Sequence, residues 1–202
     1  AGGGNPVRDA VVEIWHCDAT GVYSGFEEGS RSANGGGGGQ GGPAGGPPPN
    51  GGQQGGGQQG GPPAGGGFGE ATGNLSAGSY SEGDPQSTTT DDNLYLRGAQ
   101  PTDENGFVHF TTVYPGWYHG RTVHIHCRVH IDKKTALTGQ IYFDDTLNDS
   151  IYSTVSPYDT HTGRDTRNNT DTIYDATGLT SAERQGGTVY AGLKLGVSDS
   201  PG

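Results

Sequence analysis

Short runs of β-branched and aromatic residues recur along the chain, and each run is bounded by glycine, proline or aspartate. None of them spaces its apolar residues as an amphipathic helix does, so the pattern predicts strands. The expected strands are residues 10–17, 94–97, 107–113, 122–131, 137–143 and 188–197. Single helical turns are expected at residues 147–154 and 181–185, and a polar loop at 156–177. Repeated short strands predict an all-β fold, an antiparallel β-sandwich with long loops.

A block of low complexity interrupts this pattern at residues 33–69. It holds about half of the 41 glycines and half of the 12 prolines. Such a segment cannot bury enough apolar surface to offset the entropy lost on ordering it. We interpret it as an insertion loop between strands, either a plain linker or a segment that acts as a substrate lid or binds a surface. The other residues, about 165, suffice for one modest core, so residues 1–202 are expected to form a single domain.

The chain is acidic, with a net charge of -11 and no basic run. This balance argues against nucleic acid and anionic membranes as partners. No apolar stretch approaches the roughly 20 residues of a membrane span. The absence of methionine and the many Ser, Thr, Gly and Asn residues favour a secreted protein. The pattern indicates no particular oligomeric state.

The only two cysteines, Cys17 and Cys127, lie in expected strands. Two cysteines are too few for a disulfide framework or for a zinc site made of thiolates alone. They are expected either to form one bridge or to be two buried thiols.

The densest chemistry lies in PGWYHGRTVHIHCRVH, from Pro115 to His130. Side chains alternate along a strand, so His124 and His126 share a face and form either a metal clamp or a surface or hydrogen-bonded pair. His130 lies about 13 Å beyond His126, too far for the same ion. Imidazole suits zinc, copper, nickel or iron. The nearby phenol of Tyr118 favours iron(III), because a phenol with a pKa of about 10 needs a strongly Lewis-acidic cation to ionise at neutral pH.

Three segments together resemble the intradiol ring-cleavage dioxygenases, the catechol, protocatechuate and hydroxyquinol dioxygenases, and above all their extracellular fungal and actinobacterial branch. The segments are VVEIWHCDATGVYSGF (Val11 to Phe26), LRGAQPTDENGFVHFTTVYPGWYHGRTVHIHCRV (Leu96 to Val129) and TGQIYFDD (Thr138 to Asp145). They stand in the family's order and cover roughly a third of the chain. The resemblance implies one non-haem iron(III) ion per chain, with four ligands: Tyr23, Tyr118, His124 and His126.

The resemblance also implies the reaction, in which O2 opens a small aromatic diol to a cis,cis-muconate-type dicarboxylate. Tyr118 corresponds to the ligand that substrate displaces. Arg121 corresponds to the family arginine that stabilises charge on the substrate, and Gln140 to the glutamine that orients it. We expect uncharged catechols and hydroxyquinol to be favoured over protocatechuate, because no second basic residue accompanies Arg121. A secreted enzyme of this kind fits lignin breakdown.

Family members usually carry a further segment upstream of the first strand, so the domain is expected to be N-terminally incomplete. Two alternatives stay open. One is a non-catalytic secreted β-sandwich that binds polysaccharide or lignin fragments, and the other is a transthyretin-like structural sandwich whose histidine pair is incidental. The remaining conspicuous residues are expected to pack, to organise turns or to lie at the surface, with His119 as the main rival ligand: Trp15, His16, Arg97, Gln100, Asp103, His109, Trp117, His119 and His161.

Overall fold

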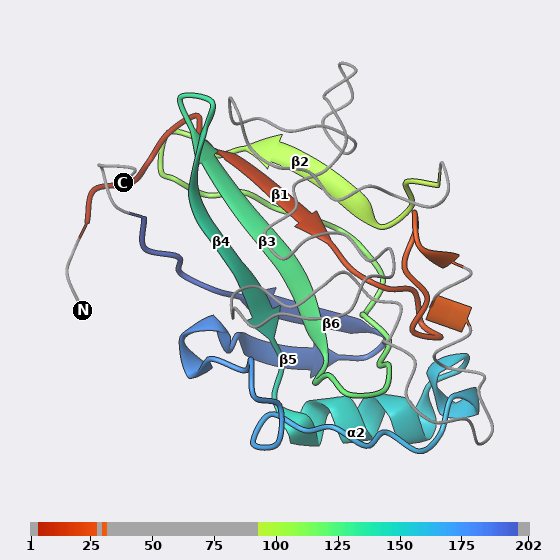
Figure 1. Cartoon of the computed structure of the whole chain (residues 1–202). Helices are drawn as coiled ribbons and strands as arrows, with labels where there is room; N and C mark the ends of the chain where they lie inside the picture. Colours follow the sequence, from red (N-terminus) through yellow and green to blue (C-terminus); the bar gives the residue numbers. More distant parts are fainter. Residues whose placement is uncertain (1–3, 28–29, 32–92, 198–202) are drawn as a thin grey trace.

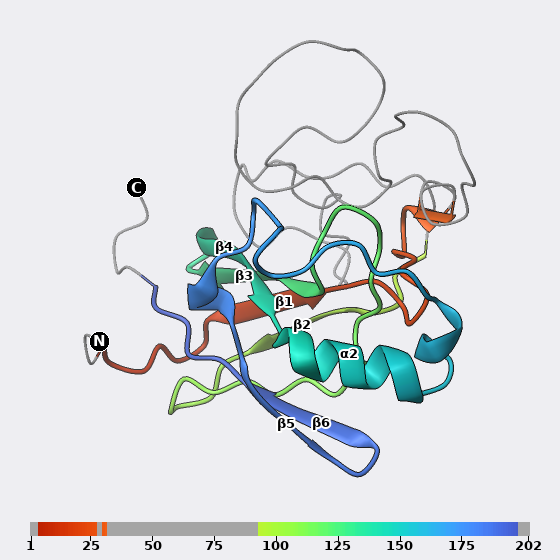
Figure 2. The same ribbon diagram turned by 90° about the horizontal axis from the view of Figure 1, so that it is seen from below.

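The computed structural model describes residues 4–27, 30–31 and 93–197 (Figure 1). Within these ranges four strands form an antiparallel sheet in the order β2-β1-β3-β4: β1 (Val11–Trp15), β2 (Arg97–Pro101), β3 (His124–Ile131) and β4 (Lys134–Tyr142). A separate hairpin of β5 (Ser181–Gln185) and β6 (Thr188–Gly192) crosses the large sheet at an angle (Figure 2). The helix α2 (Asp145–Thr154) and the 3-10 turns η1 (Tyr158–Thr160) and η2 (Ala176–Gly178) complete the described elements. The all-β fold class is confirmed.

The two faces of the large sheet differ in character because side chains alternate along β1 and β3. Ile125, Cys127 and Val129 of β3 join the main hydrophobic core, and Ala182 and Val189 of the hairpin pack against that core. The opposite face of β3 carries His124, His126, Arg128 and His130, all of them buried. The sheet therefore has one apolar face and one buried polar face.

The antiparallel pairing of β1 with β3 decides where loops meet. Trp15, the last residue of β1, pairs with His126 near the start of β3. The chain leaving β1 and the chain entering β3 therefore lie at the same end of the sheet, as Figure 1 shows. Residues 16–27 and 115–123 are brought together there.

Three of the expected elements were wrong or misplaced. The strand expected at residues 94–97 lies instead at Arg97–Pro101, where it pairs with β1. Residues 107–113 form no strand; Phe107 and Val113 are 63% and 47% exposed. Residues 181–185 form β5 rather than a helical turn, because Gly186 and Gly187 make a two-residue hairpin turn, with φ +62° at Gly186.

The helix α2 is longer than the single turn expected within residues 147–154. It begins two residues earlier, at Asp145, where the side chain of Asp144 accepts a hydrogen bond from the backbone N–H of Thr146. This N-cap satisfies a donor that the first helical turn leaves without a partner. The insertion at residues 33–69 lies outside the described residues.

Both cysteines are buried free thiols, so the second of the two sequence alternatives is correct. Cys17 donates a hydrogen bond from Sγ to the carbonyl of Gly116, at 3.2 Å, whereas Cys127 belongs to the main core. In the described part of the chain, no helix is both long enough and apolar enough to cross a bilayer.

Candidate metal site

Four polar atoms from three parts of the chain converge at the end of the sheet where β1 ends and β3 begins. Nε2 of His124 lies 3.3 Å from the phenol oxygen of Tyr23, 3.2 Å from that of Tyr118 and 3.2 Å from Nε2 of His126. All four side chains are buried, none more than 6% exposed. The structure thus brings together the four residues expected to bind a metal, while their role as ligands stays a prediction.

Each imidazole is held by a neighbour. Nδ1 of His124 lies 2.7 Å from the carbonyl oxygen of Thr122; a carbonyl only accepts, so Nδ1 carries the hydrogen. Nε2 is then left with a free lone pair, as metal-binding histidines require. The ring of His126 stacks on Trp15, with centroids 4.7 Å apart and planes 5° from parallel. Trp15 thus packs, as expected, but against a candidate ligand.

The contacts of His124 fit a bound cation. Nε2 offers one lone pair, yet three other polar atoms lie within 3.3 Å of it. One lone pair accepts one good hydrogen bond, so these contacts cannot all be satisfied by hydrogen bonding. A cation shared by the four atoms removes this conflict, because each atom binds it with a lone pair. Among the described residues no three His, Cys, Asp or Glu side chains form a metal group, so this site depends on its tyrosines.

Burial keeps all four groups neutral when no cation is bound. It raises the pKa of Tyr23 well above its usual value and also raises that of Tyr118. It lowers the pKa of His124 to about 3, with the charge of Arg121 adding to the effect. The pKa of His126 is lowered well below its usual value, mainly by burial and then by His124. A bound cation would have to displace the two phenol protons.

These shifts predict an acid-sensitive fold for the metal-free protein. Burial also lowers the pKa of His16, so three histidines stay neutral when folded but take up protons near pH 6.5 when unfolded. Stability is therefore expected to fall as pH drops from about 6.5 toward 3, by up to about 1.4 kcal/mol per pH unit for each histidine. Glu13, whose pKa burial raises, acts in the opposite direction but is a single group. Chelator-treated protein should unfold at lower urea concentration at pH 5 than at pH 7; equal midpoints would contradict this.

Arg121 and Gln140, expected on the substrate side, are joined by a hydrogen bond. Nη2 of Arg121 donates to Oε1 of Gln140, and Nε of Arg121 donates to Oδ2 of Asp171 at 2.9 Å. Gln140 pairs across the sheet with His126. The charge of Arg121 acts on both phenols, opposing the rise in the pKa of Tyr118. Both residues therefore border the four converging groups, although their roles in chemistry stay predictions.

The two tyrosine-bearing segments are clamped together at Gly116. Its N–H donates to the carbonyl of Asp18 at 3.0 Å. The side chain of Asp18 accepts from the N–H groups of Thr20 and Val22, which shapes the turn before Tyr23. Gly116, which precedes Tyr118 by two residues, thus lies directly against the turn that leads to Tyr23.

The other histidines do not join the four groups. His119 is half exposed, and its Nδ1 lies within hydrogen-bond distance of a carboxylate oxygen of Asp165, at 3.1 Å. His16 forms hydrogen bonds with the carbonyl of Cys17, through Nδ1, and with the hydroxyl of Thr112, through Nε2. His109 is exposed. His161 stacks on Trp117, and His130 lies 3.6 Å from Glu13 inside the sheet. The positions of His16, His109 and His161 agree with the packing or surface roles expected for them, and the rival ligand His119 lies outside the four groups.

Two residues near the site were missed from the sequence. Asp171 holds Arg121, and Tyr142 donates a hydrogen bond to Oε1 of Gln140 at 2.8 Å. Tyr142 lies two positions after Gln140 on β4, so the two side chains share a face of the sheet. This spacing could have identified Tyr142 from the sequence. Asp171 lies in a polar loop without a motif. Arg97 was expected to organise a turn, and it donates to the hydroxyl and carbonyl oxygens of Ser24, the residue after Tyr23.

The solved structures that share this fold include two dioxygenases. One is an intradiol ring-cleavage dioxygenase from Tetranychus urticae; it is 27% identical, the match covers 96% of this chain and 73% of that one, and the TM-score is 0.62. The other is the crystal structure of a dioxygenase; it is 26% identical, with 96% and 72% covered and a TM-score of 0.64. The sequence matches no family model and no curated protein sequence. The resemblance to intradiol dioxygenases is confirmed at the level of structure, and the chain has a dioxygenase-like fold.

Proposed function

We propose that this protein is a non-haem iron(III) intradiol dioxygenase that opens catechol-type rings with O2 to cis,cis-muconate-type dicarboxylates. Tyr23, Tyr118, His124 and His126 would hold one iron(III) ion per chain. The observation that carries the proposal is the buried convergence of two phenol oxygens and two imidazole nitrogens, at 3.2 to 3.3 Å from Nε2 of His124. The dioxygenase-like fold supports it.

The donor set favours iron(III) over the other cations that imidazole binds. Because burial raises the pKa of Tyr23 and Tyr118, only a strongly Lewis-acidic cation displaces their protons at neutral pH. A hard trivalent ion does so best. Two phenolates offset two of its three charges, which lowers the cost of burying it.

The residues of the site have distinct roles in this proposal. Iron(III), when bound, would supply Lewis acidity toward the diol and a centre at which the diol and O2 meet. Tyr118 would give way to the substrate, and its phenolate oxygen would take up one proton from the diol. Arg121 places a permanent charge beside the ring and stabilises negative charge that develops on it. Gln140 orients the diol by donating from Nε2.

The charge balance favours uncharged catechols and hydroxyquinol over protocatechuate as substrates. A carboxylated ring needs a cation of its own, and the charge of Arg121 is already paired with Asp171, whose side chain is 1% exposed. We further propose that the enzyme is secreted, which its composition favours, and that it acts on aromatic fragments of the kind released from lignin.

Iron content, colour and product together test this function. The purified protein is expected to contain about one iron per chain and to be reddish, because charge transfer from tyrosinate to iron(III) absorbs visible light. With catechol it should consume O2 and yield a muconate-type product, and catechol and hydroxyquinol should turn over faster than protocatechuate. A colourless, iron-free protein that leaves catechol intact would fit the binding-module alternative and exclude the enzyme.

A further inference from the structure

The carboxylate of Asp171 contacts the candidate site from a distant loop. Its side chain is 1% exposed and accepts three hydrogen bonds. Oδ2 accepts from Nε of Arg121 and from the N–H of Thr122, both at 2.9 Å, and Oδ1 accepts from the N–H of Ile173 at 2.8 Å. These hydrogen bonds and the charge of Arg121 hold the pKa of Asp171 below its usual range although burial acts to raise it.

The contacts of Arg121 show what this carboxylate does. Nε of Arg121 donates to Asp171 and Nη2 donates to Gln140. Nη1 of Arg121 is buried and has no hydrogen-bond partner in the part of the chain that the structure describes. Oε1 of Gln140 accepts from both Arg121 and Tyr142, which fixes the amide so that Nε2 is the remaining group. That Nε2 is also buried without a partner among the described residues. Two donors are thus left for a ligand.

Asp171 also reaches a candidate metal ligand, through Thr122. The N–H of Thr122 donates to Asp171, and the carbonyl of the same residue accepts from Nδ1 of His124 at 2.7 Å. The hydroxyl of Thr122 donates to Oδ1 of Asn168, three positions before Asp171, at 2.6 Å. One loop therefore sets both the guanidinium of Arg121 and the backbone that orients the ring of His124.

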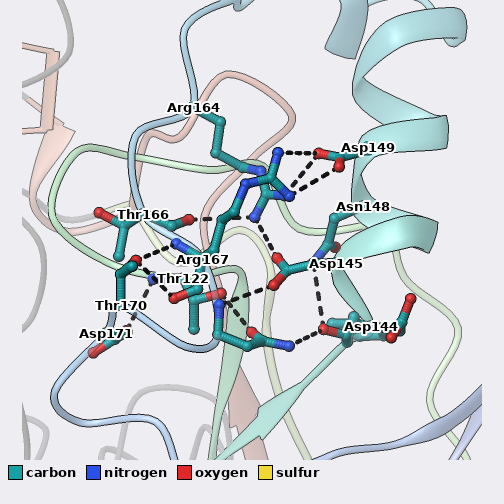
Figure 3. Close-up of polar contacts among 12 residues, drawn as sticks. Thr122, Asp144, Asp145, Asn148, Asp149, Arg164, Thr166, Arg167, Thr170 and Asp171 are labelled. Atoms are coloured by element: carbon teal, nitrogen blue, oxygen red, sulfur yellow. Dashed lines mark hydrogen bonds and ion pairs between the residues drawn. The ribbon is translucent and has the colours of Figure 1, made fainter.

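The loop that carries Asp171 is itself anchored to α2, as Figure 3 shows. Arg164, whose side chain is 7% exposed, pairs with Asp145 and Asp149 at 2.7 Å each. Arg167 also donates to Asp149, and the N–H of Asn168 donates to Asp145. These contacts tie residues 164–171 to a helix, so the position of Asp171 does not depend on a free loop.

We propose that Asp171 is a positioning residue, which holds Arg121 and the Thr122 backbone so that the remaining donors of Arg121 and Gln140 meet the substrate. This inference rests on the proposed function. A buried guanidinium without a counter-ion lowers the stability of the folded state. Without the charge of Asp171, the side chain of Arg121 is therefore expected to change its position. In Asp171→Asn the side-chain oxygen can still accept from the N–H of Thr122, so the backbone that orients His124 keeps this contact while the charge is lost. The loss should therefore appear in substrate handling rather than in the resting metal site.

The test compares Asp171→Asn with Asp175→Asn, a matched control on an exposed carboxylate that caps η2 through Thr177. Asp171→Asn is expected to keep its iron and visible band. Its affinity for catechol without O2, followed by the shift of that band, should fall about tenfold, and its turnover about 100-fold, the scale of losing one preorganised donor. Asp175→Asn should match the wild type. Unchanged catechol affinity and turnover in a coloured Asp171→Asn protein would overturn the proposal.

A double-mutant cycle covers the case in which Asp171→Asn folds poorly, because the double variant with Arg121→Gln no longer contains the buried charge that the single variant leaves unpaired. If Asp171 acts through Arg121, adding Asp171→Asn to Arg121→Gln should lower turnover less than about threefold further, because contacting residues are not additive. Full additivity of the two losses would overturn the positioning role. A colourless, iron-free wild type would remove the proposed function and this inference with it, whereas a coloured, active wild type beside an unaffected Asp171→Asn removes the inference alone.

Discussion

The His124→Ala variant is expected to purify without iron and without colour, and to lose catechol turnover to the background rate. Nε2 of His124 is the atom that the other three groups share, at 3.2 to 3.3 Å. Removing it leaves two phenols and one imidazole, and burial then keeps the phenols protonated, since their pKa is raised. Metal analysis, the visible spectrum and O2 uptake measure the effect.

His119→Ala is the matched control for this variant. It makes the same substitution beside Tyr118, but His119 is half exposed and pairs with Asp165. It should retain iron, colour and turnover. A coloured His124→Ala protein with full iron content, or a bleached His119→Ala protein, would transfer the ligand role to the rival histidine.

Gly116→Ala is expected to lower the free energy of unfolding by about 1–3 kcal/mol or more, the usual cost of overpacking a tight contact. A Cβ at this position would lie 2.3 Å from the carbonyl oxygen of Asp18 and 2.8 Å from backbone atoms of Ala19 and Gly21. These are backbone atoms, so no side-chain rotation relieves the clash. The two tyrosine-bearing segments must separate, and iron binding should weaken together with stability.

Gly139→Ala is the control, because its Cβ would meet only Cδ2 of Leu137, at the ordinary distance of 3.8 Å. Urea unfolding and iron titration of both variants measure the difference. Equal stability of the two variants would mean that the contact between Gly116 and Asp18 does not hold the tyrosines together.

The candidate site was largely predictable from the sequence because its chemistry is local or carried by motifs. The parity of His124 and His126 follows from strand alternation, and Tyr118 stands six positions before His124 in the same segment. Tyr23 is different: nothing in its own neighbourhood marks it, and only the resemblance over residues 11–26 assigned it. The structure adds the pairing of β1 with β3, which explains how residues from separate segments meet.

What the sequence did not predict depends on long-range contacts. Asp171 lies 50 positions from Arg121, in a loop whose polar residues resemble any exposed loop. The strand at residues 181–185 is short and polar, and its identity depends on pairing across Gly186 and Gly187. The apolar alternation at residues 107–113 pairs with no strand among the described residues. In each case the deciding contact is not encoded in the local pattern.

Because the four candidate metal ligands are far apart along the chain, binding of the ion is coupled to folding. Tyr23 and His124 are 101 positions apart, so an unfolded polypeptide does not present them as one chelate. An ion that binds only the native state raises the unfolding free energy by about 2.7 kcal/mol at a free concentration 100 times its Kd. The concentration of free iron would then affect the lifetime of the folded protein as well as its activity. A chelator that removes the ion would lower the free energy of unfolding.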